Sequence, residues 1–397
     1  MVLPKATAIN LFNPFTEEHE MFRKSVRAFV EKEIRPHVDE WEEAEIAPLH
    51  ELFKKMGELG FLGLNYPEKY GGAEADIWFT VVFAEELARA GAAGIPMATL
   101  VHTDMATPAL ARHGSEELKE RYLMPAIRGE MVSAIAVTEP DAGSDVARIK
   151  TRAERDGDDY IINGSKLYIT NGTQADWLCL LARTSPGDDY QGMSLIIVPT
   201  DTPGFTISKK LKKLGNHSSD TAFLTFEDVR VPVSNRIGEE GFGFYYQMEQ
   251  FQVERLVGAL GGVAGAELVV RDTIAYCQER HAFNKPLIAS QWIQFKLAEL
   301  LTEIEATRQL NYLCAAKIEA GEDNMEVTRI ASMCKLKAGR LMREVADTCL
   351  QFYGGMGYME ETPISRYFRD ARLTSIGGGA DEVMLGIIAK LENMNPR

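Results

Sequence analysis

Cysteine is scarce in this chain: its 397 residues include only five, at positions 179, 277, 314, 334 and 349, and none stands in a C-x-x-C pair. An odd number of scattered cysteines argues against a disulfide framework or a zinc cluster and fits a reducing compartment. The seven histidines are also dispersed, and no H-E-x-x-H pattern occurs. We therefore expect no catalytic metal.

Long apolar runs are missing as well. None reaches the roughly 18 residues that a membrane-spanning helix requires, and the N-terminal segment has neither the apolar core of a signal peptide nor an arginine-rich amphipathic leader. The formal net charge of −15 argues against non-specific binding to nucleic acid or to an anionic membrane. We expect a cytoplasmic protein, or a mature organellar form whose leader is absent.

The common nucleotide-binding and hydrolase motifs are absent too. No G-x-G-x-x-G follows a predicted strand, and neither G-x-S-x-G nor G-x-x-x-x-G-K-[ST] occurs. A nicotinamide-binding Rossmann fold and a hydrolase triad therefore have no support. Any chemistry should come from an organic cofactor or from single acids and bases.

The residue pattern changes twice along the chain, and the three resulting parts predict an α+β multidomain protein. Residues 1–130 favour an N-terminal helical domain, whose first helix Thr16 can cap. Residues 131–235 contain short β-rich runs with turn residues between them, which indicates an antiparallel β-barrel. Within it, Asn163-Gly164 in "DYIINGSKLYIT" predicts a hairpin turn. Residues 236–397 are rich in helix formers with few breakers, which indicates a C-terminal helical bundle.

Four segments, in order and in register, carry a resemblance that covers essentially the whole chain. They are "VTEPDAGSD" (137–145), "KLYITNG" (166–172), "ERHAFNKPLIASQ" (279–291) and "QFYGGMGYMEETPISRYFRDAR" (351–372). Together they resemble the acyl-CoA dehydrogenase family. The resemblance implies a helical domain, a central β-barrel and a four-helix bundle, with FAD between barrel and bundle. It also implies a homotetramer that passes electrons to an electron-transferring flavoprotein.

The resemblance assigns FAD contacts residue by residue. The loop around Thr138 would edge the flavin ring, Tyr168 would lie against the ring, and Arg280 would reach the diphosphate of the adjacent subunit's FAD. The family often has tryptophan where Tyr168 stands, and glycine where Asn284 stands. The full set of expected cofactor contacts is Ile135, Val137, Thr138, Ser144, Tyr168, Thr170, Arg280, Phe283, Gln291, Gln351, Gly354, Gly355, Ala380 and Glu382.

Most relatives carry their catalytic glutamate in a C-terminal "EGT" triplet, but this chain has "GGA", with Gly378 in the place of the glutamate. In a minority of the family, resembling isovaleryl-CoA and long-chain dehydrogenases, the base precedes an arginine on a helix. Glu254-Arg255 occupies that place. We therefore expect Glu254 to be the base that takes the α-proton; the alternative is a solvated helix glutamate paired with Arg255 or Arg271. The Gly378 N–H is expected to polarise the thioester carbonyl.

Resemblance further places Ser144, Ser219, Gln252, Arg255 and Gly377 along the path of the acyl-CoA. The glycines would leave room for a branched or bulky acyl chain. The basic residues among 209–213 either contact CoA or form a solvated charge run, and the second interpretation is preferred.

The function expected is therefore an FAD-dependent acyl-CoA dehydrogenase. Two other functions stay open: an oxygen-using flavoenzyme or desulfinase of the same fold, and a catalytically silent flavoprotein. Glu254 argues against a desulfinase, which needs no α-base.

Overall fold

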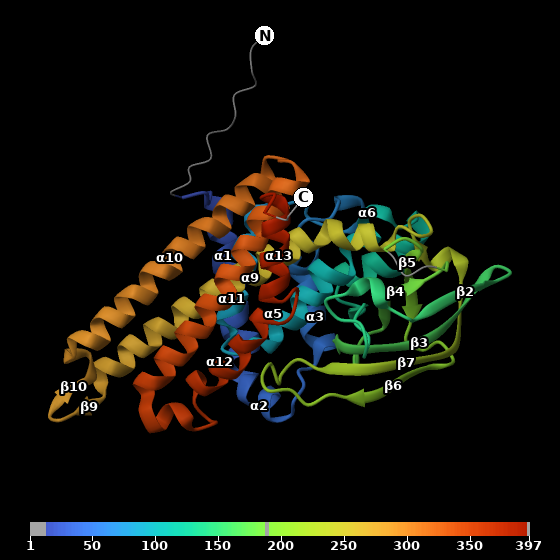
Figure 1. Cartoon of the computed structure of the whole chain (residues 1–397). Helices are drawn as coiled ribbons and strands as arrows, with labels where there is room; N and C mark the ends of the chain where they lie inside the picture. Colours follow the sequence, from blue (N-terminus) through green and yellow to red (C-terminus); the bar gives the residue numbers. More distant parts are fainter. Residues whose placement is uncertain (1–12, 187–189, 395–397) are drawn as a thin grey trace, which may run out of the picture.

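The computed structural model describes residues 13–186 and 190–394. Its helices and strands form an N-terminal group of helices, a central sheet and a C-terminal group of long helices (Figure 1). The sheet lies at one end of the molecule, and the long helices extend away from it as an arm. The predicted α+β arrangement is confirmed.

The N-terminal helices begin as the sequence predicts. The side chain of Thr16 accepts a hydrogen bond from the backbone N–H of His19, and two glutamates occupy the first turn. A π-helical turn, η6 (Val101–Ala106), follows α5 and faces the later helix α9. The helices are α1 (Glu17–Phe29), α2 (Val38–Glu43), α3 (Leu49–Glu58), α4 (Ile77–Leu87), α5 (Gly94–Leu100), α6 (Pro108–His113), α7 (Glu116–Leu118) and α8 (Met124–Ile127).

The central domain is one eight-stranded sheet with the path β6-β7-β3-β2-β4-β5-β8, and β1 pairs with β4. Its pairs are antiparallel, as expected, except that β4 runs parallel to both β1 and β2. The strands are β1 (Ser133–Ala136), β2 (Arg152–Asp156), β3 (Asp159–Thr170), β4 (Trp177–Arg183), β5 (Met193–Pro199), β6 (Phe205–Lys210), β7 (Thr221–Pro232) and β8 (Arg236–Ile237).

The hairpin predicted at Asn163-Gly164 is wrong. β3 runs straight through this dipeptide, and the turn lies earlier, around Gly157 between β2 and β3. The pairing of β3 with β7 shifts register between Ile162 and Gly164, so the dipeptide marks a β-bulge. A Cβ on Gly164 would come within 2.5 Å of the Thr151 hydroxyl, which explains the glycine without a turn.

Long helices make up the C-terminal domain, as predicted, and α9 connects them to the rest of the molecule. Val81 of α4 belongs to the same buried cluster as Leu256 and Leu260 of α9 and Leu341 of α11. α9 therefore packs against both the N-terminal helices and the rest of the bundle. The elements are α9 (Gly243–Glu279), β9 (His281–Ala282), β10 (Lys285–Pro286), α10 (Gln291–Glu319), α11 (Asn324–Tyr353), α12 (Pro363–Ala371) and α13 (Asp381–Leu391). Among the described residues, no helix combines the length and apolarity needed to cross a membrane.

Candidate active site

Glu254 lies on α9 and is buried, with 5% of its surface exposed. Burial raises the pKa of its carboxyl to about 8; Arg255 and Lys335 oppose that rise, and the charge of Asp104 adds to it. Arg271 forms its ion pair with Glu267 instead, at 3.3 Å. Because the carboxyl is buried, the alternative of a solvated surface glutamate is wrong. Glu254 is a carboxyl whose basicity is set by removal from water.

Gly378 faces Glu254 from the loop that precedes α13. A Cβ built on Gly378 would lie 3.4 Å from Glu254 Oε1. The backbone of Gly378 has φ of +61°, a conformation that residues other than glycine rarely adopt. A glutamate here would therefore place a second carboxyl against the first. Glu254 and Gly378, the two positions at which the sequence departs from most relatives, therefore lie next to each other, and the site holds one carboxyl.

Lys335 of α11 holds this glycine loop in place. Its ammonium donates a hydrogen bond to the backbone carbonyl of Gly379, and its side chain is buried. Burial lowers the pKa of Lys335 to about 8, against the opposing effects of Asp381 and Glu254. On the same loop, the N–H of Gly377 donates to the carbonyl of Leu373 at 2.9 Å. The loop thus has a fixed backbone although Gly377 and Gly378 are exposed.

A buried ion pair fixes the loop that the resemblance assigns to the flavin edge. The ammonium of Lys166 donates to the Val137 carbonyl at 2.8 Å and to Glu139 Oε1 at 2.9 Å. The Glu139 carboxylate also accepts from the backbone N–H groups of Lys150 and Thr151. Burial acts to raise the pKa of Glu139, but Lys166 and these hydrogen bonds hold that pKa below its ordinary value. The pair anchors residues 137–139 to β3.

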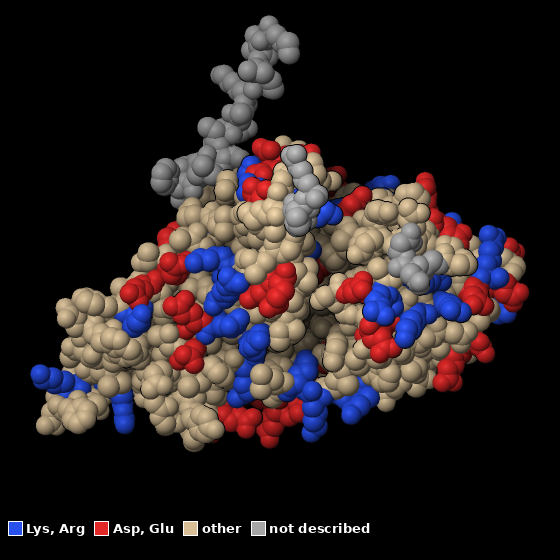
Figure 2. Space-filling model, in the orientation of Figure 1, with Lys and Arg blue, Asp and Glu red and all other residues tan. Residues whose placement is uncertain are grey.

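Tyr168 projects from β3 beside this loop. The pairing of β3 with β7 is irregular between Lys166 and Ile169, and Tyr168 has φ of +62° with 66% of its surface exposed. The adjacent Leu167 N–H donates to the Thr138 carbonyl at 2.8 Å. The structure therefore brings the Ile135-to-Thr138 segment and the Tyr168-to-Thr170 segment together. Figure 2 shows a hollow between the helical arm and the sheet.

A second group of predicted cofactor contacts lies elsewhere, at the far end of the arm from the sheet (Figure 1). Phe283 and Asn284 both have positive φ in the β9–β10 turn, which suits a tight hairpin, and asparagine tolerates this conformation in place of glycine. Phe283 is fully exposed. The stacked rings of Tyr276 and Tyr353 bring the ends of α9 and α11 together. Arg280, Phe283, Gln291, Gln351, Gly354 and Gly355 therefore share one end of the arm.

The remaining predicted residues have varied surroundings. Ser144 is exposed, whereas Ser219 is buried and its hydroxyl donates to the Asp220 carbonyl at 3.3 Å. The Gln252 amide donates to α11 at Thr328 Oγ1, 2.7 Å away. Arg255 is buried beside Glu254. Two more residues stand at the start of α13: Ala380 is its N-cap residue, and Glu382 is exposed in its first turn.

The lysines within residues 209–213 differ in their surroundings. Lys213 is half-buried, and its ammonium donates to the Ser219 carbonyl. Lys209 and Lys210 are exposed on β6, and Lys212 is exposed just after it. Lys213 therefore stabilises its own loop.

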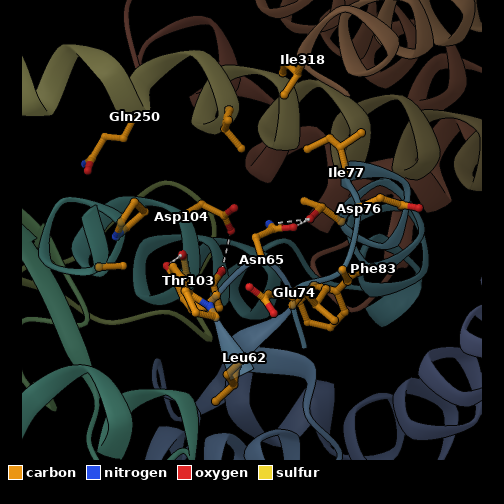
Figure 3. A pocket seen from close by; sticks show the side chains of 18 of the residues that line it. Leu62, Asn65, Glu74, Asp76, Ile77, Phe83, Thr103, Asp104, Gln250 and Ile318 are labelled. Atoms are coloured by element: carbon orange, nitrogen blue, oxygen red, sulfur yellow. Dashed lines mark hydrogen bonds between the residues drawn. The ribbon is translucent and has the colours of Figure 1, made fainter. Parts of the chain in front are cut away.

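Sequence reasoning missed a cavity of about 610 Å³ that lies alongside α9 (Figure 3). Gln250 and Val253 line it from α9, Asp104 from η6, and Ile77 from α4. In the close-up, Asp104 and Gln250 point into the space between these elements. The one available signal was the spacing of Gln247, Gln250 and Glu254, which places three polar residues on one face of a helix.

Three family models match successive parts of the chain. They are the acyl-CoA dehydrogenase N-terminal domain over residues 16–130, its middle domain over 134–229 and its C-terminal domain over 241–391. In this order the three models define an oxidoreductase of the three-domain acyl-CoA dehydrogenase class. The chain belongs to the acyl-CoA dehydrogenase family, whose members are flavoproteins.

Individual relatives cover nearly the whole chain. The chain is 40% identical to a long-chain specific mitochondrial acyl-CoA dehydrogenase of Sus scrofa, over 97% of this chain and 89% of that one. An acyl-CoA dehydrogenase of Bacillus subtilis is 38% identical over 94% and 98% of the two chains. The solved structure of an acyl-CoA dehydrogenase from Geobacillus kaustophilus is 43% identical, with a TM-score of 0.90 over 96% of this chain and 99% of that one.

Proposed function

We propose that the protein is an FAD-dependent acyl-CoA dehydrogenase in which Glu254 abstracts the α-proton of the thioester. The observation that carries the proposal is the buried Glu254 carboxyl facing the glycine loop across a gap that a side chain at position 378 would enter. Because the carboxylate is desolvated, it is a stronger base than an exposed glutamate. Its substrate would be a medium, long or branched acyl-CoA.

Two groups around Glu254 would orient the thioester. The Gly377 N–H already donates to Leu373, which leaves the Gly378 N–H to bind the thioester carbonyl. A donor at that oxygen stabilises the charge that develops when the α-proton leaves. Lys335 would keep the donor in place through its bond to Gly379.

The residues near the hollow suit FAD. Bound there, FAD would accept the hydride from the β-carbon. The backbone from Val137 to Thr138 would pair with the polar edge of the ring, and the exposed Tyr168 ring would lie against its face. Arg280 suits a diphosphate because its guanidinium donates two parallel hydrogen bonds.

A basic region near the sheet suits the anionic end of CoA, although the whole chain is acidic. Arg148, Lys150 and Arg152 line a cavity of about 970 Å³. Figure 2 shows lysine and arginine side chains over the sheet end, with acidic side chains among them. Local positive charge of this kind attracts a polyanion despite an opposite net charge.

The test is an anaerobic titration of the purified flavoprotein with octanoyl-CoA and isovaleryl-CoA, following the visible flavin band. Bleaching supports a dehydrogenase, and the faster thioester begins to define the acyl group. Mixing the bleached protein with air and with oxidised electron-transferring flavoprotein separates a dehydrogenase from an oxygen-using enzyme. No bleaching with any thioester tested would contradict the proposal.

The rate of bleaching should depend on pH through Glu254. The base acts only when deprotonated, and burial raises its pKa to about 8. We expect kcat/KM for octanoyl-CoA to rise with pH between about 7 and 9 and to level off above that range, because this parameter reports the free enzyme. A stopped-flow profile that is flat from pH 6 to 9 would contradict this assignment.

We further propose that a neighbouring copy of the chain completes the FAD site and that the assembly is a homotetramer. The exposed Phe283 lies in the β9–β10 hairpin, at the end of the arm away from the sheet of its own chain. We expect Phe283→Ser to lower the FAD content and to shift the molecular mass, measured by light scattering, toward smaller species. Met21→Ser is a matched control, since Met21 is also exposed but lies on α1. An unchanged mass and FAD content in Phe283→Ser would contradict this assignment.

A further inference from the structure

The cavity of Figure 3 lies next to the candidate base on α9, because Val253, the residue before Glu254, lines it. Gln250 lies about one helical turn before Glu254 on α9, and its amide donates to the Met105 carbonyl at 2.6 Å. This bond joins α9 to η6 beside Asp104. Asp104 is close enough to Glu254 for its charge to act on that carboxyl. An acyl chain that extends from Glu254 along α9 would therefore pass these two side chains.

Asp104 offers its carboxylate to the cavity, whereas the Gln250 side-chain oxygen is buried. Asp104 Oδ2 accepts from Thr103 Oγ1 at 2.5 Å. Gln250 is 1% exposed, and its Oε1 has no hydrogen-bond partner among the described residues. Asn65 and Thr80 also line the cavity, but they hydrogen-bond to each other at 2.8 Å. Asp104 Oδ1 accepts no hydrogen bond from the described residues, so this carboxylate has room for a further donor.

An unsubstituted acyl chain fits this lining poorly. It would remove water from Asp104 and return no hydrogen bond, and a buried acceptor left unpaired weakens binding on the order of tenfold to a hundredfold. A site built to bind a hydroxyl discriminates strongly against the analogue that lacks it. The lining holds Arg112 as well as the carboxylates of Glu74, Asp104 and Glu319, and a hydroxyl suits such a mixed lining because it can both donate and accept.

We propose that the acyl group this enzyme takes carries a hydroxyl along its chain, which donates to Asp104 in this cavity. The proposal rests on the proposed dehydrogenase function and names the class of its substrate, a hydroxyacyl thioester. Asp104 is then a specificity-determining residue, and Glu254 keeps its role as base.

The experiment compares kcat/KM for octanoyl-CoA with that for octanoyl-CoA bearing a hydroxyl at C5, C6, C7 or C8. In the wild type, at least one isomer should exceed octanoyl-CoA by about tenfold or more. Asp104→Leu should reduce that ratio to about one or below, and Asp104→Asn should reduce it less because the amide keeps an acceptor. Both thioesters use the same base, so the ratio cancels any change in Glu254 caused by removing the charge of Asp104.

Thr80→Val is the matched control, since Thr80 lines the cavity but already bonds to Asn65. It should leave the ratio within about threefold of the wild type. If octanoyl-CoA is preferred over every isomer, or if both Asp104 variants keep the wild-type ratio, the inference is overturned while the dehydrogenase function stands. Preference for an aminoacyl-CoA over the hydroxyl series would also overturn it. If no thioester bleaches the flavin, the dehydrogenase function itself fails and the inference fails with it.

Discussion

Glu254→Gln is expected to lower the rate of flavin bleaching by octanoyl-CoA by about a thousandfold or more, because it removes the general base. Glutamine has nearly the same shape but cannot take a proton at neutral pH. The FAD content should stay at the wild-type level, since Glu254 is not among the residues expected to contact the cofactor. Stopped-flow absorbance under anaerobic conditions measures the rate, and the visible spectrum measures the FAD.

The matched control is Glu249→Gln on the same helix. Glu249 is exposed and pairs with His113 at 2.8 Å, so its charge has no expected part in the reaction. Bleaching in this variant should proceed at close to the wild-type rate. Equal rates in the Glu254 and Glu249 variants would assign the base to another residue.

Lys166→Met is expected to lower the free energy of unfolding by about 3–5 kcal/mol, because removing one partner of a buried ion pair leaves the other charge uncompensated. The side chain of Lys166 is fully buried and that of Glu139 is nearly so. The loop at Val137 would also lose its hydrogen bond from the ammonium. We therefore expect weaker retention of FAD together with a lower urea midpoint.

The double variant Lys166→Met with Glu139→Gln separates the charge from the packing. Lys150 and Thr151 donate to different oxygens of Glu139, so glutamine keeps an acceptor for only one of these backbone N–H groups, and it carries no charge. It should recover part of the stability lost in the single variant. If the single variant unfolds at the wild-type urea concentration, the pair does not anchor the loop.

Local sequence determined the elements whose signals lie within a few residues. The cap at Thr16 and the long helices depend on contacts along one segment, and both formed as predicted. Asn163-Gly164 failed for the opposite reason. The same dipeptide suits a turn or a bulge, and which one forms depends on the pairing with β7 and the packing against Thr151.

The site was determined partly by sequence and partly by tertiary structure. The motifs alone indicated the family, and the missing glutamate at Gly378 pointed to Glu254. The tertiary packing around α9 buries that carboxyl, and burial is what raises its pKa to about 8. Asp104 and Gln250 carry no motif, and they line one cavity only because η6 packs on α9. A sequence pattern specifies short-range geometry, whereas removal from water depends on segments far apart in the chain.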